Sequence, residues 1–181
     1  ANAVTASSAN GGASVRGTGN IEAAGFGIDV DARGANGNAS ANWTGDIKTE
    51  DGHGARVYSA DGGADIMGSG KVESGDFGFH VESDKVGSNA ALSWAGPITS
   101  RLSFGALVQT AGGGATIKGS GAVTAAADGL FAEAIGGNAQ VNWNGAISAG
   151  NGSGVKATSN SGGASISVSY THLTLPTNRE V

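Results

Sequence analysis

The amino-acid sequence predicts an all-β fold, a three-sided parallel β-solenoid (parallel β-helix) with coils of about 25 residues. A short phrase that begins with Ala recurs every 24 to 26 residues, apolar and polar residues alternate within it, and Gly, Asn, Asp and Ser separate the alternating segments. A period in this range is typical of stacked repeats that bury their apolar faces against their neighbours. The phrase begins at Ala13, Ala39, Ala64, Ala90, Ala115, Ala139 and Ala164.

The repeated phrase has two alternating versions. One reads Gly-Ala-x-aliphatic-x-Gly-Ser/Thr-Gly and covers residues 12–19, 63–70 and 114–121. The other reads Asn-Ala-x-apolar-x-Trp-x-Gly and covers residues 38–45, 89–96 and 138–145. Both alternate with the period of a strand that has one buried face. Two unlike units therefore form a double repeat of about 50 residues.

Each unit contains two further segments with the pattern of a strand. The first follows the last Gly of the phrase and starts at Ile21, Ile47, Val72, Ile98, Val123 or Ile147, with a small residue two positions later. The second alternates after an internal Gly, as in residues 27–32, 78–83 and 154–159. The intervening Gly, Asn, Asp and Ser favour turns. Three short strands per coil predict three parallel sheets, which we expect to wind in a right-handed sense with strands about 4.8 Å apart.

We expect a single domain over residues 1–167, cut through the solenoid at both ends and therefore a segment of a longer repetitive protein. Its complete coils are expected at residues 20–45, 46–70, 71–96, 97–121 and 122–145, and partial coils at 1–19 and 146–167. Val168 stands where the repeat requires Gly, and no Gly follows it. Residues 168–177 resemble the conceptual translation of an adapter from transposase-based sequencing libraries, so we expect residues 168–181 to be a non-native tail.

The fourth position after each repeated Ala alternates between Gly and Trp, in the order Gly17, Trp43, Gly68, Trp94, Gly119 and Trp143. If these residues stack, every Trp has a Gly on the adjacent coil, which leaves room for the indole. We predict an alternating Trp/Gly column in the coil interior. The alternative is an exposed strip of three Trp that binds glycans or apolar partners.

Three asparagines, Asn38, Asn89 and Asn138, occupy the position that Gly holds in the alternate coils. Asn is one of the few residues that tolerate a left-handed backbone conformation. We therefore expect these asparagines to be left-handed turn residues.

Composition and charge exclude several classes of function. The net charge is −5 and the ten Lys and Arg are scattered singly, whereas nucleic-acid binding needs a clustered basic face. There is no Cys for a disulfide framework. No apolar run approaches the roughly 18 residues of a membrane helix. We therefore expect neither a nucleic-acid partner nor membrane insertion of this segment.

Few residues could carry chemistry. Glu50, Asp51 and His53 lie together in a Gly-flanked turn, where solvated polar residues are common. His80 is out of phase with the inward Phe79 and is expected to face solvent. The sequence predicts no catalytic, cofactor-binding or metal-binding residue, and no binding residue is identified.

Carboxylates could align between coils in one region of the rod. The coil at residues 71–96 contains Glu73, Asp76, Glu82 and Asp84. An active site of the pectate-lyase type would need carboxylates from successive coils, and the positions that match Glu82 and its neighbours are Asp29, Asp31, Arg56, Tyr58, Leu107 and Gln109. Arg56 and Tyr58 interrupt the strip of Asp29, Asp31, Glu82 and Asp84, which favours a solvated surface.

Three segments, residues 121–125, 129–139 and 144–159, resemble the β-helical passenger repeats of bacterial autotransporters. They share a Gly-Ile-x-Ala type edge, a Gly-Ile/Val-x-Ala-x-Ser strand and a Gly-rich corner, and the resemblance covers residues 1–167. It implies an adhesive or structural segment that is secreted or displayed at the bacterial cell surface, in a parent protein with an outer-membrane barrel. Filamentous haemagglutinin-like adhesins contain similar solenoids and are the alternative.

We therefore expect a non-enzymatic adhesive or structural segment. Its partner would be an unidentified host, matrix or glycan surface, or another copy of the chain. A β-helical enzyme that acts on polysaccharides would need long loops beside its groove, and coil steps of 24 to 26 residues leave no room for them. Ice binding would need regular Thr-x-Thr arrays, and the outward residues are too varied.

Overall fold

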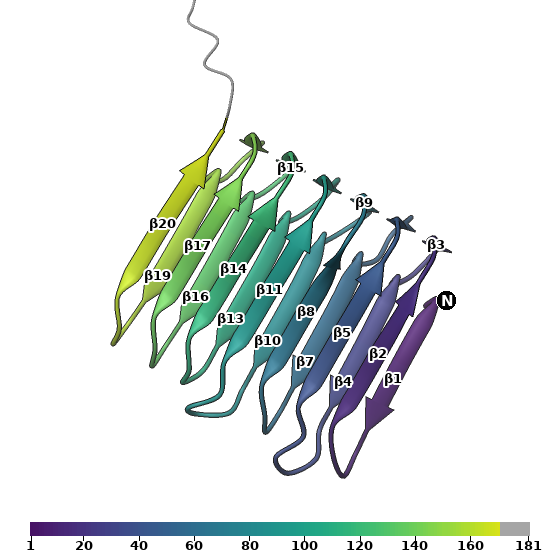
Figure 1. The fold of residues 1–181 in the computed structure, drawn as a ribbon, viewed down its shortest axis with the longest axis vertical. Coiled ribbons are helices and arrows are strands. Elements are labelled where there is room, and N and C mark those ends of the chain that lie inside the picture. The colour runs from purple at the N-terminus through teal and green to yellow at the C-terminus, as the bar shows by residue number, and fades with distance from the viewer. Residues whose placement is uncertain (171–181) are drawn as a thin grey trace, which may run out of the picture.

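The computed structural model describes residues 1–170 and forms a rod of stacked coils, seen from the side in Figure 1. The described residues form twenty strands and no helix. They accordingly include no helix that could cross a membrane.

Three parallel sheets form the three sides of the rod, and each strand pairs with the strands at the same position in the adjacent coils. Sheet A contains β1 (Val4–Ser8), β4 (Ile28–Ala32), β7 (Ala55–Ser59), β10 (Phe79–Ser83), β13 (Ala106–Thr110), β16 (Leu130–Ala134) and β19 (Val155–Ser159). Sheet B contains β2 (Ala13–Thr18), β5 (Ala39–Thr44), β8 (Ala64–Ser69), β11 (Ala90–Ala95), β14 (Ala115–Ser120), β17 (Ala139–Asn144) and β20 (Ala164–Ser169). Sheet C contains β3 (Ile21–Ala23), β6 (Ile47–Thr49), β9 (Val72–Ser74), β12 (Ile98–Ser100), β15 (Val123–Ala125) and β18 (Ile147–Ala149). The predicted three-sided β-solenoid is confirmed; its right-handed winding stays a prediction.

The last coil extends beyond its expected boundary. The segment expected as a partial coil over residues 146–167 contributes a strand to each sheet, namely β18, β19 and β20. Val168 pairs with Trp143, and β20 ends at Ser169. The non-native origin of residues 168–181 stays a prediction, and residues 171–181 lie outside the described part.

The core consists of columns in which equivalent side chains stack from coil to coil. Val30, Val57, Val81 and Val108 form one such column on sheet A, and each is completely buried. Alternating strand residues point to opposite faces, so every second residue of each strand enters the core. The repeated apolar positions of the sequence therefore become continuous apolar columns along the rod.

Buried hydroxyl groups form hydrogen bonds at the corner between sheets A and B. The last residues of β7, β10 and β13 point inward, and their hydroxyls donate hydrogen bonds to backbone carbonyl oxygens in the equivalent turn of the preceding coil. The pairs are Ser59 with Gly37 (2.7 Å), Ser83 with Gly62 (2.8 Å) and Thr110 with Ser88 (2.8 Å). These bonds satisfy polar groups that would otherwise be buried without partners.

The alternating Trp/Gly column is confirmed. Trp94 pairs with Gly68 on one side and Gly119 on the other. Trp94 and Trp143 are only 2% and 1% exposed, and Trp43 is half-buried. The alternative of an exposed strip of three Trp is therefore wrong.

Each indole also bonds to the coil before it. The indole nitrogens donate to backbone carbonyl oxygens at 2.7 to 2.8 Å, and the pairs are Trp43 with Gly19, Trp94 with Gly70 and Trp143 with Gly121. A Cβ atom on Gly68 would lie 2.6 Å from the Trp94 ring. Each indole therefore lies over the Gly-Ser/Thr-Gly segment of the preceding coil, whose first Gly gives it space and whose second Gly accepts its hydrogen bond.

The prediction of left-handed asparagines is wrong. Among the described residues other than Gly, only Asn36 has a positive φ, at 55°. Asn38, Asn89 and Asn138 instead use their side chains, because each Oδ1 reaches the next coil and accepts a backbone N–H at 2.8 Å, from Gly63, Gly114 and Gly163 respectively. These asparagines therefore connect one coil to the next.

Candidate functional site

The outer face of sheet A brings together most of the polar residues that the sequence singled out. One outward column contains Asp29, Arg56, His80, Leu107 and Phe131, and the next contains Asp31, Tyr58, Glu82, Gln109 and Glu133. This register confirms the predicted matching of positions between coils. Asp84 follows the end of β10 and lies outside both columns, so the possible strip of four carboxylates does not form.

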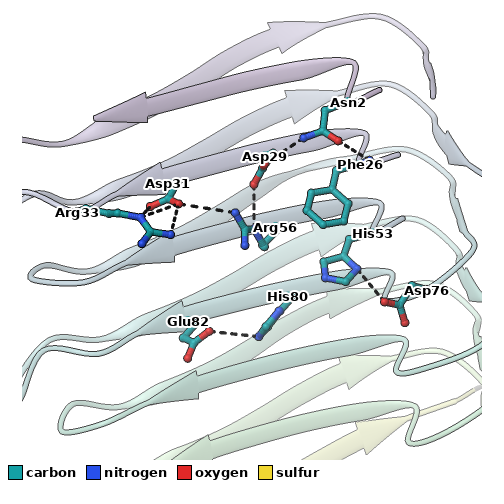
Figure 2. Close-up of polar contacts among 10 residues, drawn as sticks. All are labelled: Asn2, Phe26, Asp29, Asp31, Arg33, His53, Arg56, Asp76, His80 and Glu82. Carbon is teal, nitrogen blue, oxygen red and sulfur yellow. Dashed lines mark hydrogen bonds and ion pairs between the residues drawn. The ribbon is translucent and has the colours of Figure 1, made fainter. Parts of the chain in front are cut away.

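Opposite charges pair at the N-terminal end of this face, as Figure 2 shows. The Arg56 Nε donates to Asp29 Oδ1 at 2.9 Å, and Asp29 also accepts a hydrogen bond from the Asn2 side chain. The Arg33 guanidinium binds Asp31 through Nε and Nη2 at 3.0 and 2.8 Å. Both carboxylates are therefore engaged by cations and are not free to act as a catalytic pair.

Aromatic rings run along the corner between sheets C and A and onto sheet A. We call the set Phe26, His53, Phe77, His80, Phe104 and Phe131 the aromatic strip. Ring centroids in the strip are 4.5 to 6.2 Å apart. Several rings stack nearly parallel, with interplanar angles of 12° for Phe26 and His53 and 17° for Phe77 and Phe104. Aromatic pairs in this distance range stabilise a fold beyond the area that they bury.

His53 is buried, in contrast to the solvated turn expected for it. The residue is 9% exposed, its ring stacks on Phe26, and it meets the edge of Phe77 at 4.8 Å. His53 directly precedes Gly54, just as Phe26 and Phe77 precede Gly27 and Gly78, so the coil register places its ring between theirs. Glu50 and Asp51 in the same turn are exposed, as expected.

His80 points outward as predicted, but it is not freely solvated. Its side chain is 18% exposed, and its ring stacks on Phe77 at 5.1 Å. The neighbouring strands place Arg56 and the buried Leu107 on either side of it. Sequence alternation therefore determined the direction of the side chain, and bulky neighbours on the same face determined its burial.

Each histidine approaches one carboxylate without a well-formed hydrogen bond. His53 Nδ1 lies 3.3 Å from Asp76 Oδ2, and His80 Nε2 lies 3.6 Å from Glu82 Oε2. Both nitrogens are buried and lack a hydrogen-bond partner within residues 1–170. Burial lowers the pKa of both histidines to about 4, and the charge of Arg56 adds to this effect. Both imidazoles are therefore neutral near pH 7.

This arrangement is poorly suited to catalysis. Neighbouring rings cover both imidazoles, and the Tyr58 hydroxyl donates to Asp84 at 2.6 Å, a hydrogen bond that raises the pKa of Tyr58 to about 12. Across residues 1–170, no three His, Asp or Glu side chains are placed to hold a metal ion. The aromatic strip and the Arg56–Asp29 pair beside it are therefore best explained as contacts that join the coils.

The two histidines predict a loss of stability in mild acid. Their ordinary pKa is 6.5 and their folded-state pKa is about 4, so between these values the unfolded chain binds more protons than the folded chain. Stability must then fall as the pH falls. We expect the free energy of unfolding to be lower at pH 5 than at pH 7 by about 1–2 kcal/mol per histidine. Guanidinium denaturation followed by circular dichroism at the two pH values measures this difference.

The matched variant replaces both histidines by apolar residues found in neighbouring coils, as His53→Phe with His80→Leu. Burial raises the pKa of Asp76 and Glu82, so protonation of these carboxylates favours the folded state and opposes the effect of the histidines at lower pH. The interval from pH 7 to 5 is therefore the informative one. In the double variant, the free energy of unfolding should depend much less on pH in this interval. An unchanged dependence would show that the histidines do not cause it.

Sequence reasoning missed the aromatic strip, although a signal for it exists. Phe26, His53, Phe77 and Phe104 each directly precede a Gly that is followed by the first residue of a strand of sheet A. This recurring aromatic-Gly pair marks one position in four successive coils. The aromatic strip consists of Phe and His residues and includes none of the Trp positions.

No protein-family model matches this chain, and no curated protein or solved structure is significantly similar to it. The basis for a functional proposal is therefore the geometry of the chain's own residues.

Proposed function

We propose that the chain is a rigid, non-catalytic segment of a bacterial adhesin, secreted or displayed at the cell surface and similar to the passenger of an autotransporter. A segment of a filamentous haemagglutinin-like adhesin would have the same mechanical role and differ in its route of secretion. In both cases the outer faces of the rod contact a host, matrix or glycan surface.

The observation that carries this proposal is the uniformity of the coils. In the described part of the chain, no connection between consecutive strands is longer than six residues, and most contain two to five. Active-site grooves require walls, and loops positioned on a scaffold usually provide them. A rod with short corners instead presents long, open faces, which suit contact with another surface.

The ionisable side chains support the same proposal. Arg56 joins Asp29 across a coil boundary, and Lys48 binds Glu22 of the coil before it at 2.8 Å. Tyr58 likewise donates to Asp84 of the next coil. Most of these groups therefore connect one coil to the next along the rod axis rather than converging on a point where a substrate could react.

Beads that carry the full chain test the adhesive role. We expect such beads to be retained on surfaces coated with matrix proteins, mucin or cell-wall glycans more strongly than beads that carry the heat-unfolded chain. In parallel, the chain should release no reducing ends or unsaturated products from soluble polysaccharides. Equal retention of folded and unfolded chain on every surface would contradict adhesion. Turnover that disappears in a Glu82→Gln variant would contradict the non-catalytic role.

A further inference from the structure

An elongated hollow lies on the outer face of sheet B, away from the aromatic strip. A groove of about 880 Å³ crosses β8, β11, β14 and β17, and a second hollow of about 310 Å³ extends it to β20. The two hollows share Thr116, Lys118 and Gln140. Five strands at a spacing of about 4.8 Å make this sheet-B groove roughly 20 Å long. Its open, elongated form suits a segment of a polymer rather than an enclosed small molecule.

The sheet-B groove is almost uncharged. Its lining contains one carboxylate, Asp65, and one ammonium group, Lys118, and the other side chains are hydroxyl, carboxamide or apolar. Polyanions such as nucleic acid or sulfated glycans need several clustered cations. Met67 is 50% exposed in the groove and offers an apolar surface beside the hydrogen-bonding groups. The lining therefore favours a neutral polymer with many hydroxyl groups and some apolar C–H surface.

Fixed hydrogen-bond donors line one edge of this groove. Asn38, Asn89 and Asn138 are exposed there, and each is held by the hydrogen bond from the next coil to its Oδ1. A carboxamide has two further donors on Nδ2, which make no hydrogen bond to the protein within residues 1–170. Because the Oδ1 bond already restricts the side chain, a ligand that accepts from Nδ2 loses little conformational entropy on binding.

The asparagines recur every second coil, a step of roughly 10 Å along the rod. The interior Trp/Gly alternation has the same two-coil period, so the outer groove repeats with the double repeat of the sequence. In an extended β-1,4-linked glycan, each sugar is flipped relative to the sugar before it, so the same orientation returns every two sugars. The length of this disaccharide repeat is close to the two-coil step of the asparagines. Peptide addition to a strand edge is excluded at β8, β11, β14 and β17, because each of these four strands is paired on both sides.

We infer that the sheet-B groove binds a neutral, extended β-1,4-linked polysaccharide that lies along the rod axis. This inference rests on the proposed function and names the partner of one face. The donors of Asn89 and Asn138 hold successive disaccharide units, and Met67 contacts an apolar sugar face.

Affinity electrophoresis of the full chain tests this inference. Native gels contain hydroxyethylcellulose or β-1,4-xylan as probes, dextran as a neutral polymer of different linkage, and polygalacturonate as an anionic polymer. We expect hydroxyethylcellulose and β-1,4-xylan to retard the chain, and dextran and polygalacturonate to leave its mobility unchanged. Added salt should change the retardation little, because charge pairing contributes little to binding.

Two substitutions locate the site. Asn89→Asp keeps an oxygen acceptor for the Gly114 N–H and removes the donors, and we expect about tenfold weaker binding from the lost hydrogen bonds. Ser93→Lys puts a long side chain into the groove and should abolish retardation. Thr124→Lys is the matched control, because it makes a similar change at an exposed position of sheet C and should bind like the unmodified chain.

The outcomes separate this inference from the proposed function. Retardation by polygalacturonate alone, or equal retardation of the Ser93→Lys and unmodified chains, overturns the groove as a neutral-glycan site. If no polysaccharide retards the chain but coated beads still adhere to protein surfaces, the groove inference fails and the adhesive role stands. If β-1,4-glycans bind and are also cleaved, the groove inference stands and the non-catalytic role fails.

Discussion

Trp94→Ala is expected to lower the free energy of unfolding by about 3–5 kcal/mol, the range for removing a large buried aromatic side chain. Trp94 is 2% exposed, its ring packs against Phe79 at 4.8 Å, and its indole nitrogen donates to Gly70. The substitution removes all three contributions and leaves a cavity over Gly68, which has no side chain to fill it. Guanidinium denaturation at pH 7, followed by circular dichroism, measures the loss.

Trp43→Ala is the matched control for this prediction. Trp43 makes the equivalent hydrogen bond to Gly19 but is half-buried, so less apolar area returns to water when it is removed. We therefore expect a smaller loss for Trp43→Ala than for Trp94→Ala. A change near zero for Trp94→Ala, together with loss of binding to an apolar or glycan surface, would restore the exposed-strip interpretation.

Gly119→Ala is the second substitution with a large expected effect. A Cβ atom at this position would overlap the backbone carbonyl oxygen of Trp94 on one side and lie 2.6 Å from the Trp143 ring on the other. Neither neighbour can move without disturbing a sheet or a buried indole. Overpacking and local strain of this kind predict a loss of about 2–4 kcal/mol in the free energy of unfolding.

Gly17 allows the contribution of the indole to be isolated. The three heavy atoms nearest to a Cβ atom on Gly17 would all belong to the Trp43 ring. In a double-mutant cycle of Gly17→Ala and Trp43→Ala, we expect the double variant to lose about 1–3 kcal/mol less than the sum of the single losses. Strictly additive losses would mean that the Gly is not needed to make room for the Trp.

Most of the fold could be predicted because the repeat sets the register. The predicted strand starts at Ile21, Ile47 and Val72 are the first residues of β3, β6 and β9, and Ala13 and Ala39 begin β2 and β5. In a stack of nearly equal coils, aligning the phrases also aligns the strands. The pairing of Trp94 with Gly68 and Gly119 therefore follows from counting residues alone.

The candidate site was less predictable, because its properties depend on side chains from different coils. Alternation shows that His80 points outward, but its burial depends on Phe77, Arg56 and Leu107 around it. A Gly-flanked turn usually exposes its polar residues, whereas His53 packs between two Phe rings at a corner. Local sequence gives no direct measure of these neighbours on the outer surface.

The sequence by itself determined the class of fold, the three strands of each coil, their register and the alternation of Trp with Gly. These features follow from the period of the chain, because residues at equal positions must stack when every coil has nearly the same length. Only the tertiary structure decided on which adjacent coil each indole packs and that Asn38, Asn89 and Asn138 bind the next coil. It also decided where the grooves and the aromatic rings lie on the outer surface. These features depend on side-chain direction and on contacts across coil boundaries, which the repeat period does not specify.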